Sequence, residues 1–366
     1  MTLDNESRIY VLGQAHIPIR NLWLLLLYAS DFYTYGTERS QGFEENPELL
    51  ADLLASILCH SVEERLIRPL TPAFMLRKQD LRRVRGRIDV LRTTTHQLLT
   101  RGQVACRFEA LTVDTPRNRL VRAGLMHLAA LVTDRKLGHR CRSQARKLAD
   151  LGVARVDSRS ALEGVTSQFA RNDAKDRSIV SAAKLALQLV LPRDNEAGGV
   201  GRAAISEQEF RRLFERAIGG FYKVAGGRSG WKTTTGRYIS WHKESETPGI
   251  QSLLPKMQTD IILENGAIRR RLIIDTKFTS SLEIRRHGGE SFKSSHLYQV
   301  YTYVRTQESP DDPLSLSSEG MLLYPSVGTS VLESFTSGGH KFTLATIDLG
   351  ASALEIREQL LSFLER

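Results

Sequence analysis

Cysteine is scarce in this sequence of 366 residues: there are three, Cys59, Cys106 and Cys141, and no two of them are close together. A zinc site or a cysteine-ligated iron–sulfur cluster needs several cysteines at short spacing, so the sequence argues against both. A sparse and odd set of cysteines is typical of proteins in a reducing compartment.

Long apolar runs are also missing. The most apolar run, Leu22 to Tyr28, has seven residues, whereas a membrane-spanning helix needs about 20. No small-residue cleavage site follows the run, so a signal peptide is not indicated. We interpret the run as a buried helix, and we expect a cytoplasmic protein with no membrane partner.

The sequence lacks the usual nucleotide and hydrolase motifs. The segment from Gly226 to Thr233 approaches a phosphate-binding loop, but Trp231 stands where the second glycine is required. No H-E-x-x-H pair, G-x-S-x-G elbow or G-x-G-x-x-G loop occurs. We therefore expect this chain to bind no nucleotide itself.

Positive charge is in excess. Lys and Arg number 51 against 41 Asp and Glu, which gives a net charge of +10. An excess of this size favours a polyanionic partner such as nucleic acid.

The length predicts two domains. A Gly-rich polar stretch, Pro192 to Gly201, is the best linker candidate. We expect an N-terminal domain of mixed α+β structure over residues 1–195 and a second domain over 205–366. The second domain begins with a capping box at Ser206 and Glu209 and then follows the pattern α-β-β-β-α-β-β-α, which predicts an α/β layer fold.

Three residues of the second domain suggest chemistry. Asp260 follows Leu254-Pro255-Lys256-Met257-Gln258-Thr259, and the apolar run Leu272 to Ile274 ends in Asp275-Thr276-Lys277. Residues 275 and 277 face the same side of a strand. Two carboxylates can hold Mg²⁺ or Mn²⁺, which polarises a phosphate and lowers the pKa of a bound water. Lys277 is suited to orient that water or to stabilise charge on the phosphate.

The spacing sets a geometric condition. A two-residue hairpin turn at Asn265-Gly266 would place Asp260 opposite residue 271. Asp260 faces Asp275 only if the loop is centred at residues 267–268. We therefore predict a wider loop, about Glu264 to Arg270, or a bulge.

Further residues surround these three in the expected order along the chain. Glu215 lies on the preceding helix, and Gln299 and Tyr303 lie on the following one. This order resembles the PD-(D/E)xK nuclease superfamily, especially its RecB-like members. For Glu215 a solvated helix face is the alternative, and for Gln299 and Tyr303 a core or interface position.

The chain also resembles, over nearly its full length, the McrC family of nuclease subunits from methylcytosine-specific McrBC restriction systems. The matching blocks are Ile17 to Leu22 with Tyr28 and Ala29, Arg85 to Asp89, Phe108 with Leu111, Asp114-Thr115 with Asn118-Arg119, Leu253 to Asp260, Asp275 with Lys277, and Leu297 to Gln299. Residues of about 135–205 match little.

This resemblance implies that the chain works with an AAA+ GTPase subunit of McrB type. It implies that the N-terminal domain docks on the GTPase and stimulates it, and that the second domain cuts double-stranded methylated DNA with Mg²⁺. Self-association of nuclease domains is a further expected contact. Two alternatives stay open: a non-cleaving adaptor that only stimulates the GTPase, and a stand-alone RecB-like repair nuclease.

Basic residues provide candidate contacts. We expect DNA phosphates to be contacted by Arg269, Arg270, Arg271, Arg285, Arg286 and Lys293. Arg85 and Arg87 are assigned to the partner, with DNA as the alternative. Arg20 and Asn21 either act at the partner's nucleotide site or cap the first helix.

Overall fold

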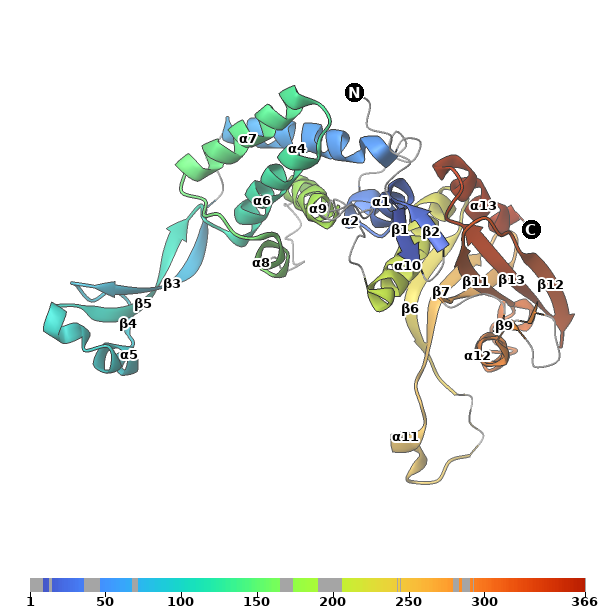
Figure 1. The fold of residues 1–366 in the computed structure, drawn as a ribbon. Coiled ribbons are helices and arrows are strands. Elements are labelled where there is room, and N and C mark those ends of the chain that lie inside the picture. Colours follow the sequence, from blue (N-terminus) through green and yellow to red (C-terminus); the bar gives the residue numbers. More distant parts are fainter. Residues whose placement is uncertain are drawn as a thin grey trace. The chain divides into compact units, whose positions relative to one another are not determined.

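The computed structural model describes residues 9–12, 15–35, 47–67, 72–164, 174–189, 206–241, 243, 245–278, 283–284, 290–291 and 293–365 (Figure 1). These residues form two compact units. Unit 1 comprises residues 1–50 together with 189–366, and unit 2 comprises residues 51–188. In the described part of the chain no helix is both long and apolar enough to cross a membrane.

The division into units corrects the predicted domain boundary. We expected residues 1–195 to form one domain, but the first 50 residues belong to the same unit as the C-terminal half. Helix α1, Ile19–Tyr28, packs on helix α10, Glu207–Phe221. The physical reason is that eight consecutive residues of α1, from Asn21 to Tyr28, are buried, so this helix needs a partner on nearly every side.

Unit 1 is built on a mixed six-stranded sheet with the order β12-β13-β11-β8-β7-β6. The strands are β6 (Lys232–Ile239), β7 (Met257–Asn265), β8 (Arg270–Thr276), β11 (Glu319–Ser326), β12 (Leu332–Ser337) and β13 (His340–Asp348). Strands β6, β7 and β8 are antiparallel neighbours, while β11 runs parallel to both β8 and β13. The predicted mixed α/β fold is confirmed, with β12 as an additional strand.

Helices cover both faces of this sheet. Helix α12, Ser294–Arg305, packs on β8 and β11, and its Val300, Tyr303 and Val304 share a core with Ile262 and Ile273. Helices α10 and α13 (Ala353–Glu365) contact β6, β7 and β13. Since neighbouring residues of a strand face opposite sides, the α12 face of β7 and β8 carries the even positions of β7 and the odd positions of β8.

The smaller elements of unit 1 are the β1–β2 hairpin (Ile9–Leu12 and Ala15–Pro18), α2 (Asp31–Tyr35), η2 (Pro47–Leu49), the π-helical turn η4 (Tyr222–Gly226), α11 (Ile250–Leu253), the β9–β10 pair (Glu283–Ile284 and Glu290–Ser291) and η5 (Ser315–Ser317). Helix α11 lies in the long connection from β6 to β7, which extends beyond the sheet (Figure 1).

Unit 2 combines helices with a small sheet. Its helices are α4 (Leu50–Leu66, whose first residue lies at the unit boundary), α6 (Pro116–Leu131), α7 (Arg135–Asp150), α8 (Ser158–Glu163) and α9 (Ala174–Gln188). The sheet has the order β3-β5-β4, from Ala73–Leu81, Val104–Thr112 and Arg87–Ile88, and carries α5 (Val90–Thr95) and η3 (Leu98–Arg101). Cys59 and Cys141, distant in sequence, place their Sγ atoms 3.5 Å apart in the helical core.

Gly220 allows the close approach of α10 to α1. A Cβ atom added at Gly220 would lie 2.0 Å from the carbonyl oxygen of Tyr28, far inside van der Waals contact. We expect Gly220→Ala to lower the free energy of unfolding by about 2–3 kcal/mol or more, because the two backbones must separate. Gly227→Ala is the matched control, since a Cβ atom added there would meet nothing within 4 Å and the φ of Gly227 is −57°. Equal stabilities of the two variants in urea unfolding would contradict this packing.

Candidate active site

The β7–β8 hairpin brings Asp260 opposite Asp275. The register pairs Ile261 with Ile274 and Asn265 with Arg270, and one further step of this register pairs Asp260 with Asp275. The register agrees with the predicted facing of the two aspartates, whereas their role in a site stays a prediction. The loop, residues 266–269, is narrower than the predicted 264–270 but has the required centre.

The loop avoids the tight Asn-Gly turn for a local reason. The Asn265 side-chain oxygen accepts hydrogen bonds from the backbone N–H groups of Ala267 and Ile268, at 3.1 and 3.4 Å. Asn265 thus closes an Asx turn at the end of β7. Arg269 completes the loop with a φ of 53°, in the left-handed region.

Asp260, Asp275 and Lys277 lie on the α12 side of the sheet, and Asp275 is the most buried of them. Only 1% of Asp275 and 7% of Lys277 are exposed. The Lys277 Nζ lies 2.6 Å from Asp275 Oδ2 as an ion pair. Within the described residues Lys277 is the one partner of that buried oxygen, and a carboxylate oxygen has two lone pairs, so Oδ2 keeps capacity to bind a further positive group.

Burial dominates the electrostatics of Asp275. It raises the pKa of this carboxyl to about 6, Lys277 opposes the rise, and the negative charge of Asp260 adds to it. The pKa of the Glu215 carboxyl is raised first by burial and then by Asp260. Asp260 thus acts on the other two carboxyl groups, and a cation held by Asp260 and Asp275 would relieve the repulsion between that pair.

Asp260 is held by the neighbouring strand. Its Oδ2 accepts two hydrogen bonds from Thr276, from the backbone N–H and from Oγ1, both at 2.7 Å. The side chain is half-buried, unlike that of Asp275. These contacts fix the orientation of Asp260 and leave Oδ1 available to a ligand.

A chain of hydrogen bonds leads from Lys277 into α12. The Lys277 Nζ donates to Gln299 Oε1 at 2.7 Å, and Gln299 Nε2 donates to Tyr303 Oη at 2.6 Å. The i, i+4 spacing of Gln299 and Tyr303 puts both on one face of the helix. Tyr303 also belongs to the buried core under α12, which confirms the alternative of a core position, while its part in catalysis stays a prediction.

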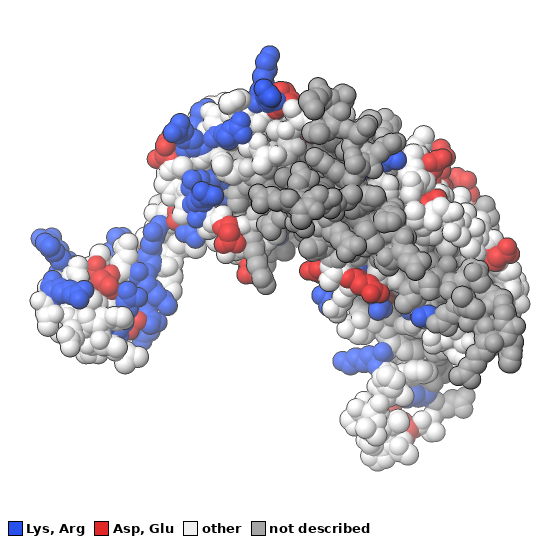
Figure 2. All heavy atoms as spheres, viewed as in Figure 1, with Lys and Arg blue, Asp and Glu red and all other residues white. Residues whose placement is uncertain are grey.

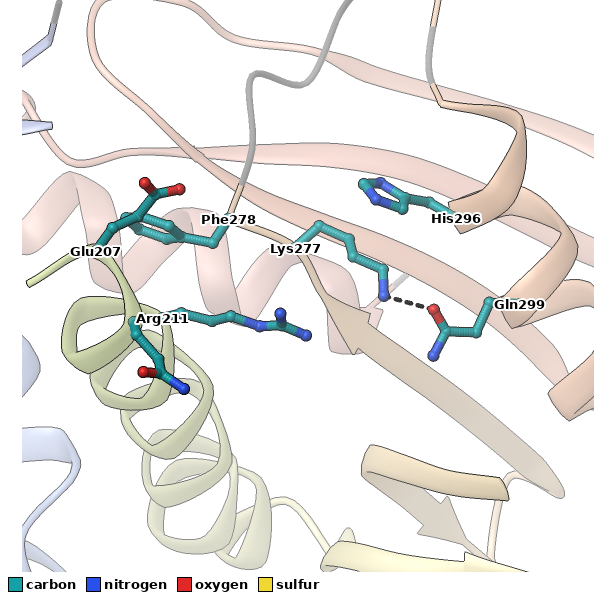
Figure 3. A pocket seen from close by; sticks show the side chains of 7 residues that line it. Glu207, Arg211, Lys277, Phe278, His296 and Gln299 are labelled. Atoms are coloured by element: carbon teal, nitrogen blue, oxygen red, sulfur yellow. Dashed lines mark hydrogen bonds between the residues drawn. The ribbon is translucent and has the colours of Figure 1, made fainter. Parts of the chain in front are cut away.

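A pocket of about 540 Å³ opens beside these residues. Its lining residues come from α10, from the end of β8 and from α12 (Figure 3): Glu207, Gln208, Arg211, Lys277, Phe278, His296 and Gln299. His296 Nδ1 lies 3.0 Å from the hydroxyl of the buried Tyr324. The pocket is therefore lined by two cationic side chains, that of the exposed Arg211 and that of Lys277, which is the partner of Asp275.

A family model with the description "McrBC 5-methylcytosine restriction system component" matches residues 3–325. The chain belongs to this family. It is 27% identical over 364 residues to the "Type IV methyl-directed restriction enzyme EcoKMcrBC" of Escherichia coli K12, which covers 96% of this chain and 98% of that protein.

Solved structures from Thermococcus gammatolerans are more distant. A half-complex of a tetradecameric assembly of McrB AAA+ hexamers with bound McrC gives a TM-score of 0.43 at 15% identity, over 94% of this chain and 76% of that chain. A second McrBC complex gives 0.28 at 16% identity, over 56% and 57%. Scores of this size do not establish a shared fold.

In this family member the structure corrects two predicted DNA contacts, Arg270 and Arg271. Arg270 forms a bidentate pair with Glu319 at 2.5 and 2.9 Å, and its guanidinium lies 5.6 Å from the centre of the Trp231 ring. Arg271 pairs with Glu264 and Asp312. Both arginines are largely buried.

The position of these two arginines in β8 explains why the prediction of DNA contacts was wrong for them. Arg270 and Arg271 stand at the start of β8, whereas Asp275 stands five residues after Arg270, or about 17 Å along a strand. Arg269 is exposed in the loop, at the end away from the carboxylates. Lys293 immediately precedes α12, near the pocket, and its role in DNA binding stays a prediction. Arg285 and Arg286 lie outside the described residues.

Asn21 also needs a correction. It is completely buried, and its Nδ2 donates to the carbonyl oxygens of Leu349 and Ala351, both at 2.8 Å. It therefore joins α1 to the segment before α13 and is not available to a partner. It does not cap α1 either, because Pro18 occupies the N-cap position without a side-chain hydrogen bond.

The predicted roles of Arg20, Arg85 and Arg87 in binding the partner stay predictions. The exposed Arg85 places its guanidinium 4.3 Å from the centre of the Phe108 ring, and Arg87 is exposed in β4. Figure 2 shows Lys and Arg side chains gathered over the β3–β5–β4 sheet of unit 2.

Sequence reasoning missed Arg211, Thr276 and Tyr324. Thr276 was passed over as the spacer of the Asp-x-Lys motif, although it holds Asp260. Their positions depend on contacts between segments far apart in the chain, for which the sequence carries no local signal.

The raised pKa of Asp275 makes stability depend on pH. Asp275 ionises in the unfolded chain near pH 3.8 but in the folded chain only near pH 6. Ionisation therefore favours unfolding as the pH rises through this window, by roughly 3 kcal/mol in total. We expect Asp275→Asn to gain up to about this stability over wild type between pH 4 and pH 8, measured by urea unfolding without divalent metal.

The exposed Asp311 supplies the control, because Asp311→Asn removes the same charge from the surface. Its stability difference from wild type is expected to stay constant over this range. An Asp275→Asn difference that is the same at pH 4 and pH 8 would show that the carboxyl is not destabilised by burial.

Proposed function

We propose that this chain is the DNA-cutting subunit of its restriction system, a Mg²⁺-dependent endonuclease activated by an AAA+ GTPase of McrB type. The observation that carries the proposal is the pair Asp260 and Asp275, facing each other on adjacent strands with Lys277 beside them. Its support also includes the membership of the family and the relative described as a methyl-directed restriction enzyme.

The residues suit a magnesium ion. The buried Asp275 Oδ2 has Lys277 as its one partner among the described residues, and Asp260 Oδ1 is not engaged by Thr276. In the described residues no cluster of three or more His, Cys, Asp or Glu residues is arranged to hold a metal. This agrees with Mg²⁺, which commonly takes one or two carboxylates and completes its octahedral shell with waters and substrate phosphate oxygens.

Magnesium, when bound, would polarise the scissile phosphate and lower the pKa of a water molecule. Asp260 and Asp275 would hold it, with Thr276 fixing the first and the ion pair to Lys277 fixing the second. Lys277 donates a hydrogen bond to the attacking water and thereby orients it. Gln299 restrains the Lys277 ammonium, and Tyr303 restrains Gln299.

Unit 2 is the proposed docking unit for the GTPase. Its β3–β5–β4 sheet and the helix α5 leave large apolar side chains in water, among them Phe74, Leu76, Leu91 and Leu111 at 59–78% exposure. Exposed apolar side chains among arginines are typical of a surface that binds another protein. The Thermococcus gammatolerans structures are described as McrC bound to McrB hexamers, and we extend that partnership to this chain.

The decisive experiment combines this protein with the GTPase of its own restriction system, methylated plasmid DNA, GTP and Mg²⁺. Wild type is expected to cut, whereas Asp275→Ala is expected to lose about 1,000-fold or more in cleavage rate. Both are expected to stimulate GTP hydrolysis equally, because unit 2 is unchanged.

The other results have clear meanings. If neither protein cuts although both stimulate hydrolysis, the chain is an adaptor. Cutting by wild type without GTP and without methylation would support a stand-alone repair nuclease, and cutting by Asp275→Ala would place the active site elsewhere.

The Gln299 contact predicts a smaller effect. Gln299→Ala frees the Lys277 ammonium from its acceptor, and we expect cleavage to fall about 10- to 100-fold, as for other residues that orient a metal ligand or its neighbour. Tyr303→Phe is the matched variant, because it removes one hydrogen bond but keeps the ring in the core. Tyr303→Phe is expected to slow cleavage less than Gln299→Ala does. A greater loss of cleavage in Tyr303→Phe would contradict the assignment of Gln299 as the direct partner of Lys277.

A further inference from the structure

Arg211 stands apart from the other arginines near the site. It lies on α10 with Glu207 one turn before it and Glu215 one turn after it, so both acids are within reach of an i, i+4 pair. Within the part of the chain that the structure describes, Arg211 nevertheless forms no ion pair or hydrogen bond and is exposed. Arg270 and Arg271, by contrast, are each paired with carboxylates.

The side chain of Arg211 points into the pocket instead. Figure 3 shows its guanidinium reaching from α10 toward Lys277 and Gln299 across the opening. Lys277 is already paired with Asp275 at 2.6 Å, so Arg211 is the cation of this pocket whose donors are not engaged within the described residues, and they suit an anion that enters the pocket.

We propose that Arg211 binds a phosphate of the DNA backbone in this pocket, at or next to the phosphate that is cut. This inference rests on the proposed function and adds a residue to it. A guanidinium can donate two parallel hydrogen bonds to a phosphate, and such contacts fix the position of a duplex without reading its sequence. Arg211 thus takes the role that sequence analysis assigned to Arg270 and Arg271.

The pocket has room for this ligand. Its volume of about 540 Å³ exceeds that of a phosphate group, and Glu207, Gln208 and Phe278 line it in addition to the two cations. The exposed position of Arg211 means that its replacement removes no buried contact, so the fold is expected to be unaffected.

The test compares Arg211→Ala with Arg212→Ala. Arg212 is equally exposed on the same helix but does not line the pocket, because consecutive helical residues point about 100° apart. With the GTPase, GTP, Mg²⁺ and methylated plasmid, Arg211→Ala is expected to cut about 10- to 100-fold more slowly than wild type. Arg212→Ala is expected to stay within about twofold, and GTP hydrolysis is expected to be equal in all three.

The variant Arg211→Lys tests whether cleavage needs only the positive charge of Arg211 or also its planar guanidinium. Lysine keeps the positive charge but not the planar pair of donors, so we expect part of the lost rate to return. Equal cleavage by wild type and Arg211→Ala would overturn the inference while leaving the proposed function intact. An equal loss in Arg211→Ala and Arg212→Ala would also overturn it, since a general effect of surface charge would then suffice.

A binding measurement tests the proposed phosphate contact of Arg211 even if the protein does not cleave DNA. The full chain is titrated onto a fluorescent duplex of about 20 base pairs in Ca²⁺, and its affinity is followed as the salt concentration changes. Loss of one phosphate contact is expected to weaken binding and to reduce the salt slope by about 1 for Arg211→Ala only. Binding by wild type that is matched by Arg211→Ala, or no binding by either, would overturn the inference.

Discussion

The proposed active site depends on one constraint, the register of the β7–β8 hairpin. Asp260 and Asp275 share a face only because the loop between the strands has four residues, 266–269. A slip of one residue would move every side chain of one strand to the other face of the sheet. Asp275 would then lie on the α10 side, away from Gln299. Asn265 secures this register through its hydrogen bonds to the loop, so a residue without any proposed chemical role determines the geometry of the site.

Contacts between segments that are far apart in the sequence hold the rest of unit 1 together. The N-terminal helix α1 is part of unit 1, where Gly220 permits its close approach to α10 and Asn21 donates hydrogen bonds to the chain before α13. The carboxyl groups, by contrast, are placed at an energetic cost, because burial raises the pKa of Asp275 to about 6. The packing of α1, α10 and α13 contributes stability that offsets such a cost, as is common around functional sites.

The sequence predicted much of this site, and the failures have physical causes. The apolar run before Asp275 and the alternation along a strand were sufficient to place Asp275 and Lys277 together, and the required pairing with Asp260 set the centre of the loop. The domain boundary was wrong because a helix that is buried on nearly all sides does not indicate which part of the chain buries it. Arg270 and Arg271 seemed available because Glu319 and Asp312 lie 40 residues or more further along the chain. Arg211 was overlooked since an arginine on a helix usually faces water.

The central claim is that Asp260 and Asp275 together hold one catalytic metal site. Crystals of the protein soaked in Mn²⁺, which substitutes for Mg²⁺ and scatters anomalously, test it most directly. The account predicts an anomalous peak within about 2.0–2.3 Å of a carboxylate oxygen of each aspartate, and its loss in Asp275→Asn. A peak bound elsewhere, or an unchanged peak in Asp275→Asn, would contradict the account.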